Sequence, residues 1–190
     1  MGAGSHGHDI AAIWRAVHGT AIDLQDEQND KFPAPDRFRA DVAYLGVNDS
    51  RQRAELWERI ERLNYRGAPK LYHPTAYVHD VFTRRHDWSS IVIGAHAYVE
   101  RCSVGEHTHI NYGAMFVRTM MGAFVTIGPG VHGAGDCTIG NYVMIGAGAT
   151  ICDRVTIGDG ATIGAGAIVL PETIIPPGET WVGNPAKRLR

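Results

Sequence analysis

The sequence predicts a small α/β unit over residues 1–73, then a parallel β-helix over residues 74–170 and a C-terminal extension over 171–190. Three observations predict this fold class. Helix and strand patterns alternate over the first part of the chain, as in a parallel sheet with packed helices. A six-residue repeat runs through the second part. Glycine accounts for 23 of the 190 residues, well above an average of about 7%, and most of it lies in that repeat.

Composition and charge exclude several classes of function. Lys and Arg total 18 against 20 acidic residues, for a net charge of −2, and no long run of one sign favours a nucleic acid partner. No uninterrupted apolar run approaches the length of a membrane span, and no secretory signal is visible at the N-terminus. Three cysteines without a CxxC pair indicate neither a disulfide framework nor a cysteine zinc site. We therefore expect a soluble, cytoplasmic protein that binds neither nucleic acid nor membrane.

The α/β unit is predicted from apolar patterns at helical or strand spacing. Asp9–Val17 carries an apolar stripe typical of one helix face. Asp49 or Ser50 is placed to cap a second helix. The apolar face expected for that second helix comprises Ala54, Trp57, Ile60 and Leu63. The strands expected around these helices are Ala21–Leu24, Asp41–Val47 and Lys70–Tyr72.

The start of the chain carries a candidate nucleotide-binding turn. Gly2, Gly4 and Gly7 match the G-x-G-x-x-G pattern that brings backbone N–H groups and a helix N-terminus to a phosphate. A buried strand normally precedes this pattern, and only Met1 precedes it here, so we expect a Rossmann-like unit without its first strand. Asp23, near the end of the predicted strand Ala21–Leu24, and Asn48, which follows Asp41–Val47, are the expected substrate contacts. The alternative is a glycine-rich helix start with solvated loop side chains.

The six-residue repeat is clear from Met121 onward. It reads MGAFVT, IGPGVH, GAGDCT, IGNYVM, IGAGAT, ICDRVT, IGDGAT and IGAGAI, with an aliphatic residue first and Gly133 as the one exception. Neither a helix nor an amphipathic strand keeps a period of six on one side, whereas a short strand followed by a corner does. If three such units make one coil, equivalent side chains stack in interior columns. Upstream, corners shortened by one residue at Val99–Val104 and Phe116–Met121 keep the pattern, so we expect about four coils between Val78 and Val169.

These segments resemble a known family along nearly the whole chain. GAGSHGHDIA, LGVNDSRQR, YHPTAYV, the repeats and VGNPAKR are similar to the sialic acid O-acetyltransferase-like sugar acyltransferases, a group that includes N-acetyltransferases of UDP-4-amino sugars. The resemblance implies a left-handed β-helix and a homotrimer. It also implies a nucleotide-sugar held by the N-terminal unit and acetyl-CoA as cosubstrate, bound in the groove between neighbouring solenoids.

The general base of that family does not transfer to this sequence. The family carries a histidine just before the coil that begins here at Met121, where this chain has Val117 and Arg118. His132 is the leading substitute, because Asp136 lies four residues on to orient it, and proton removal needs a group that titrates near neutrality. The pair His107 and His109 is the second candidate. The alternative for His132 is a solvent-exposed histidine on the solenoid surface without a catalytic role. The alternative for His107 and His109 is a solvated corner.

A metal site and a cysteine nucleophile are not expected. Some trimers of this architecture resemble γ-class carbonic anhydrases, but the solenoid lacks the H-x₄-H spacing of that family. Only an accident of assembly would bring His107, His109 and His132 together as the convergent ligands that zinc needs. Cys137 occupies a small inward position, which favours a packed, inert thiol.

The cofactor site is expected at small corners and at the basic C-terminus. Gly146, Ala147, Gly164 and Ala165 would let a pantetheine arm approach the backbone, although the fold alone also explains small residues there. Lys187 and Arg188 are candidates for the phosphates of CoA, or form a basic tail over the last coil.

The leading hypothesis is acyl transfer from acetyl-CoA to an amine or hydroxyl of a nucleotide-linked sugar. The missing histidine and missing first strand motivate the alternative of a non-catalytic homologue that binds a nucleotide-sugar or scaffolds other proteins. An acceptor other than a nucleotide-sugar is a third possibility.

Overall fold

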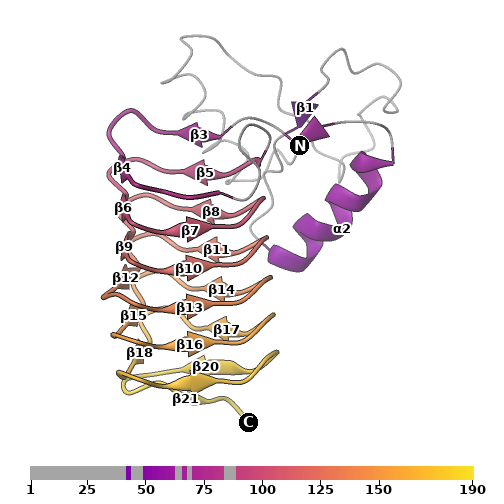
Figure 1. Ribbon diagram of the computed structural model, residues 1–190. Coiled ribbons are helices and arrows are strands. Elements are labelled where there is room, and N and C mark those ends of the chain that lie inside the picture. Colours follow the sequence, from indigo (N-terminus) through magenta and orange to yellow (C-terminus); the bar gives the residue numbers. More distant parts are fainter. Residues whose placement is uncertain (1–41, 44–48, 63–65, 68–69, 84–88) are drawn as a thin grey trace.

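The computed structural model describes residues 42–43, 49–62, 66–67, 70–83 and 89–190 of the chain. They form a parallel β-solenoid of about six turns with one helix against its side (Figure 1). No helix among these residues is long and apolar enough to cross a membrane. The predictions for Gly2, Gly4, Gly7, Asp23 and Asn48, for the helix Asp9–Val17 and for the strand Ala21–Leu24 lie outside the described residues.

Three parallel sheets form the walls of the solenoid. The eight-stranded sheet contains β3 (Leu71–Tyr72), β5 (Val92–Ile93), β8 (His109–Ile110), β11 (Thr126–Ile127), β14 (Met144–Ile145), β17 (Thr162–Ile163), β20 (Thr180–Val182) and an antiparallel β21 (Lys187–Arg188). The six-stranded sheet contains β4 (Tyr77–His79), β6 (Tyr98–Glu100), β9 (Met115–Val117), β12 (His132–Gly133), β15 (Thr150–Ile151) and β18 (Ile168–Val169). The five-stranded sheet contains β7 (Ser103–Val104), β10 (Met120–Met121), β13 (Thr138–Ile139), β16 (Thr156–Ile157) and β19 (Ile174–Ile175).

The aliphatic position of each repeat points inward, as the repeat predicts. Ile127 pairs in register with Ile145, and Ile145 with Ile163, so equivalent residues stack 18 apart. Each of these three side chains is at most 1% exposed. The two shortened corners are also confirmed, because Val99, Val104, Phe116 and Met121 all stay in the buried core. Stacked aliphatic columns therefore supply the stability of the solenoid.

The exception at Gly133 has a packing cause. Gly133 pairs in register with Phe116 on the neighbouring strand. A Cβ added to Gly133 would lie 2.3 Å from two carbon atoms of the Phe116 ring. The large ring thus fills the space that the aliphatic side chain occupies in the other coils.

The described part of the α/β unit is a β–α–β segment. Strand β1 (Val42–Ala43) pairs in parallel with β2 (Arg66–Gly67), and helix α2 (Ser50–Glu61) lies between them in the chain. Asp49 caps the helix, since its Oδ1 accepts hydrogen bonds from the N–H groups of Arg51 and Gln52. The cap at Asp49 is confirmed, and β1 lies within the predicted strand Asp41–Val47. Its parallel partner Arg66–Gly67 was not predicted as a strand.

Helix α2 faces the solenoid with the polar side chains of Ser50 and Arg53 as well as with Trp57 of the predicted apolar face. The side chains of Ile60 and Leu63 lie outside the described residues. Arg53 is fully buried and donates hydrogen bonds to the carbonyl oxygens of His107, Phe124 and Val125. Burial lowers the pKa of Arg53 to about 9, and the neighbouring Asp49 acts in the opposite direction. The guanidinium thus stays charged at neutral pH and fixes the helix to two successive coils.

The solenoid is longer than the repeat alone indicates. Leu71 and Tyr72, expected in the sheet of the α/β unit, pair with β5 and open the eight-stranded sheet. At the other end, β19 and β20 add to the five- and eight-stranded sheets beyond residue 170. At each end another residue replaces the glycine that follows the aliphatic position, His73 in the first coil and Pro176 in the last, which is why the sequence does not show these coils.

Candidate functional site

The three edges of the prism differ in the residues that occupy their left-handed corner positions. The bare edge joins the eight- to the six-stranded sheet and has glycine in four successive coils. The charged edge lies between the six- and five-stranded sheets and has Arg, Asp or Glu at its corners. The aromatic edge lies between the five- and eight-stranded sheets and has aromatic rings at the corners of three successive coils. The residues with positive φ are His96, Gly113, Gly130, Gly148 and Gly166 on the bare edge; Asp80, Arg101, Arg118, Gly135, Asp136, Arg154 and Glu172 on the charged edge; and Ser90, His107, Phe124, Tyr142, Gly160 and Gly178 on the aromatic edge.

The four glycine corners of the bare edge are also open. A Cβ added to any of its four glycines would meet no heavy atom within 4 Å. The other two edges hold Arg, Asp and Tyr in the same backbone conformation. Packing therefore does not require glycine on the bare edge, although glycine adopts this conformation with the least strain.

Two backbone N–H groups on the bare edge are unpaired. Within the part of the chain that the structure describes, no group accepts a hydrogen bond from the N–H of Ala147 or Ala165. Both residues are exposed. The equivalent N–H groups on the aromatic edge, at Ala123 and Asn141, are capped by side-chain oxygens of Asn141 and Asp159 in the next coil. The bare edge thus offers a row of donors to an outside acceptor.

His132 lies on the outward face of the six-stranded sheet, two residues after Gly130 of the bare edge. Its side chain is exposed, and it pairs in register with Met115 on one side and Thr150 on the other. Ala147 lies one coil farther along the solenoid and Ala165 two coils. The structure therefore brings His132, Gly146, Ala147, Gly164 and Ala165 to one flank of the same sheet.

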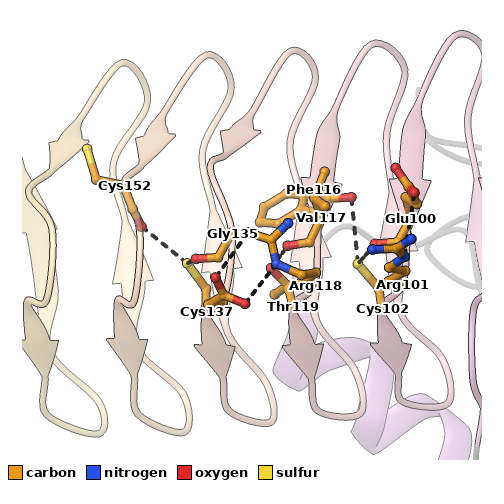
Figure 2. Close-up of polar contacts among 11 residues, drawn as sticks. Glu100, Arg101, Cys102, Phe116, Val117, Arg118, Thr119, Gly135, Cys137 and Cys152 are labelled. Carbon is orange, nitrogen blue, oxygen red and sulfur yellow. Dashed lines mark hydrogen bonds and ion pairs between the residues drawn. The ribbon is translucent and has the colours of Figure 1, made fainter.

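Asp136 does not orient His132, contrary to the expectation from spacing. Both of its carboxylate oxygens accept hydrogen bonds from Arg118, at 2.9 Å from Nε and 3.0 Å from Nη2. This ion pair lowers the pKa of Asp136 and raises that of Arg118. A Cβ on Gly135 would lie 2.9 Å from Nη2 of Arg118, so the guanidinium rests against a bare backbone (Figure 2). An ion pair on the charged edge thus occupies the region where the resemblance places a histidine.

His107 and His109 are buried, at 2% exposure each. The His107 ring stacks between Trp57 of helix α2 and Phe124, with ring centroids 4.3 and 4.7 Å apart. On the strand next to His109, Thr126 accepts a hydrogen bond from Ser50 at the start of helix α2. Helix α2 therefore covers this pair. Neither imidazole reaches the solvent-exposed surface next to the bare edge.

The C-terminal cations lie at the end of the solenoid on β21. Lys187 to Arg190 line an open hollow of about 710 Å³. Arg188 forms an ion pair of 3.2 Å with Glu179, which lies just before the adjacent strand β20, whereas no side-chain partner of Lys187 or Arg190 is found in the described chain. Lys187 and Arg190 are thus the cations of this hollow that are available to a phosphate.

The three cysteines lie behind the charged edge. Cys102 and Cys137 are buried, and their Sγ atoms donate to corner carbonyl oxygens such as those of Glu100 and Gly135 (Figure 2). Burial raises the pKa of both thiols. Cys137 is packed, as its small inward position predicts, and both thiols also serve as internal hydrogen-bond donors. No group of three metal-ligating side chains occurs among the described residues.

Sequence reasoning missed Arg53 and the ion pair of Arg118 with Asp136. A lone arginine among helical residues gives no signal of burial. The spacing of 18 residues between Arg118 and Asp136, one full coil, is a signal that the repeat could have supplied.

Comparison with known proteins gives a consistent result. The repeats match the family model described as bacterial transferase hexapeptide (six repeats), over residues 118–153 and 136–171. No curated protein sequence matches the chain. The acetyltransferase domain of PglB from Neisseria gonorrhoeae is 30% identical, with 99% of this chain and 97% of that domain covered and a TM-score of 0.81. The same domain in complex with acetyl coenzyme A is 31% identical, with 99% and 96% covered and a TM-score of 0.78.

PerB from Caulobacter crescentus, solved with CoA and GDP-perosamine, shares the fold at 24% identity, with 100% of this chain and 95% of that chain covered and a TM-score of 0.83. The PglB likeness extends over nearly the full length of both chains, through the α/β unit as well as the repeats. This chain belongs to the hexapeptide-repeat sugar acyltransferases of the left-handed β-helix type.

Proposed function

We propose that the protein transfers an acetyl group from acetyl-CoA to an amine or hydroxyl of a nucleotide-linked sugar, as a cytoplasmic homotrimer. The observation that carries this proposal is the alignment of His132, the unpaired N–H groups of Ala147 and Ala165, and Lys187 along one flank of the solenoid. The PglB domain and PerB, whose structures contain acetyl coenzyme A or CoA, support the choice of cosubstrate.

Each part of this flank has a distinct role. The amide carbonyl oxygens of the pantetheine arm accept hydrogen bonds from Ala147 and Ala165, whose strands follow one another at a spacing of about 4.8 Å. Lys187, with Arg188 beside it, neutralises phosphate at the end of the solenoid. The thioester then lies near His132, at the other end of the row.

His132 acts as the general base. It takes a proton from the acceptor as the acceptor nitrogen or oxygen attacks the thioester carbonyl carbon. The C–S bond breaks, the acetyl group stays on the acceptor, and CoA leaves as its thiol after gaining the proton. His107 and His109, covered by helix α2, serve packing instead. The N-terminal residues Gly2, Gly4, Gly7, Asp23 and Asn48 are proposed to hold the nucleotide.

The test is thiol release from acetyl-CoA in the presence of a panel of UDP-, dTDP- and GDP-linked amino sugars. Wild-type protein should release free thiol with at least one acceptor, and His132→Asn should lower kcat by about 10² or more. Thr156→Asn, which places the same side chain on the five-stranded sheet, should leave the rate unchanged. Absence of release with every acceptor would count against catalysis.

One observation favours a second candidate, a nucleotide-sugar-binding homologue without catalysis. Arg118 engages both carboxylate oxygens of Asp136, so this carboxylate does not orient His132. Calorimetry distinguishes the two, because a binding protein titrates a nucleotide-sugar with equal heat in wild type and His132→Asn and releases no thiol in either.

A further inference from the structure

The outward column that contains His132 continues toward the first coil as a set of large exposed side chains. His132 pairs in register with Met115, Met115 with Tyr98, and Tyr98 with Tyr77. Met115 is 44% exposed and Tyr77 48% exposed, while Tyr98 is half-buried. None of these side chains contacts the cosubstrate in the proposed function.

Tyr98 is held rigidly in this column. Its ring stacks on Tyr77 with centroids 4.6 Å apart and an angle of 11° between the planes. Its hydroxyl donates a hydrogen bond of 2.6 Å to Oε2 of Glu100. This bond is the main cause of a raised pKa of Tyr98. The ring and the carboxylate therefore form one preorganised unit.

Glu100 keeps one carboxylate oxygen available. Its Oε1 lies 3.8 Å from Nε of Arg101, which is beyond hydrogen-bond distance. No other group of the described chain donates to this oxygen. The Glu100 side chain is 23% exposed, so solvent or a ligand reaches it.

This combination is suited to the hydroxyl groups of a sugar ring. A carboxylate accepts hydrogen bonds from hydroxyls, and the exposed Met115 thioether and the tyrosine rings offer an apolar surface to the C–H face of the ring. Tyr98 lies two strands from His132, a distance of about 10 Å at the usual spacing. A hexose ring with a hydrogen bond at its far end and its reacting group at His132 spans a distance of this order.

We infer that Glu100, Tyr98 and Met115 form the subsite for the sugar ring of the acceptor, with Glu100 accepting hydrogen bonds from ring hydroxyls distant from the acylated group. This inference rests on the proposed function, because it takes His132 as the base. It places the acceptor on the N-terminal side of His132 and the cosubstrate on the C-terminal side.

Steady-state kinetics with the acceptor that gives the highest rate test the subsite. Glu100→Gln keeps the shape of the side chain and weakens the hydrogen bonds, so the KM for the acceptor should rise by about 10-fold, with little change in the KM for acetyl-CoA. Tyr98→Phe should give a smaller rise of the same kind. The matched controls are Glu172→Gln on the charged edge and Tyr142→Phe on the aromatic edge, both expected to leave each KM unchanged.

The outcomes separate this inference from the function on which it rests. Turnover with an unchanged acceptor KM in both Glu100→Gln and Tyr98→Phe would overturn the subsite and leave the transferase intact. A change in sedimentation of Glu100→Gln without a change in KM would also overturn it, and would assign this face to contact between copies of the chain. If wild type does not turn over, calorimetry with the nucleotide-sugar replaces kinetics, and equal affinity of wild type and Glu100→Gln would overturn the subsite.

Discussion

The bare edge and the charged edge border the same six-stranded sheet and have the same left-handed backbone, yet they differ in what occupies it. The charged edge holds side chains that pair across coils, such as Arg118 with Asp136 and Arg154 with Glu172. The bare edge holds glycine with open space beside it. Because the fold tolerates large side chains at these corners, the four successive glycines that follow His96 on this edge support the proposal that the cosubstrate binds there.

The largest expected effect comes from filling the bare edge. Ala165→Trp places an indole over the row of N–H groups and should weaken acetyl-CoA binding by about 100-fold or more, by excluding the pantetheine arm. Isothermal titration calorimetry measures this change. Glu172→Trp places the same ring on the charged edge and serves as the control. Equal affinity of both variants for acetyl-CoA would show that the two edges do not differ in cosubstrate binding.

A second test separates glycine required by packing from glycine required by a ligand. Gly133→Ala drives a methyl group into the Phe116 ring and should lower the free energy of unfolding by about 2 kcal/mol. Phe116→Leu in the same chain should restore part of the loss. Denaturant unfolding measures both variants, and additive losses in the double variant would show that the two side chains do not compete for space.

Gly148→Asn completes that comparison on the bare edge. Asparagine tolerates positive φ, and no atom lies near its Cβ position, so the free energy of unfolding should fall by only about 1 kcal/mol or less. Acetyl-CoA affinity should fall more noticeably, by a few-fold. A large loss of stability with unchanged affinity would indicate that glycine serves the fold there.

Thiol alkylation tests how tightly the charged edge is closed. Cys102 and Cys137 should resist iodoacetamide at neutral pH in the folded protein, because burial raises the pKa of both thiols and limits access. Cys152, which is half-buried, should react first. Mass spectrometry of the alkylated peptides measures the order, and early labelling of Cys137 would show that this edge opens.

The smallest effect concerns the exposed pair of Arg118 and Asp136. The pKa of Asp136 is lowered in the folded protein, so its contribution to stability is present above the unfolded pKa and is lost as pH falls through the folded pKa. Arg118→Met should therefore lower the thermal midpoint slightly at neutral pH and less at acidic pH. A difference that grows as pH falls would contradict the pairing.

The sequence predicts those features of the fold that depend on local period. The inward columns, the shortened corners and the exception at Gly133 all follow from spacing, and the structure adds only that Phe116 fills the gap. The cap at Asp49 is also a local signal, whereas the partner strand Arg66–Gly67 was not predicted. The solenoid ends were missed because the outer coils lack the glycine that follows the aliphatic residue in the inner coils.

The site was less predictable because it depends on contacts between distant parts of the chain. In the sequence His107 and His109 resemble a polar corner, because nothing there shows that helix α2 covers them. Arg53 resembles a surface residue, because its three acceptor carbonyl oxygens lie far away in the sequence. Asp136 lies near His132 in sequence but one coil below Arg118 in space. Small residues at Gly146, Ala147, Gly164 and Ala165 suggested a cosubstrate surface, but packing itself requires glycine at two of them. A Cβ would lie 2.5 Å from the backbone N of Ala165 at Gly146 and 2.7 Å from Cγ1 of Val182 at Gly164. The comparison of the edges therefore applies to the corner glycines such as Gly148 and Gly166.

Amide-resolved NMR during titration with CoA tests the role of the bare edge most directly. The N–H groups of Ala147 and Ala165 gain acceptors when the pantetheine arm binds, so their resonances should move with increasing CoA, together with that of Lys187. Resonances of Arg118 and Arg154 should stay in place. Shifts confined to the charged edge, or none at Ala147 and Ala165 under saturating CoA, would contradict the assignment of the bare edge to the cosubstrate.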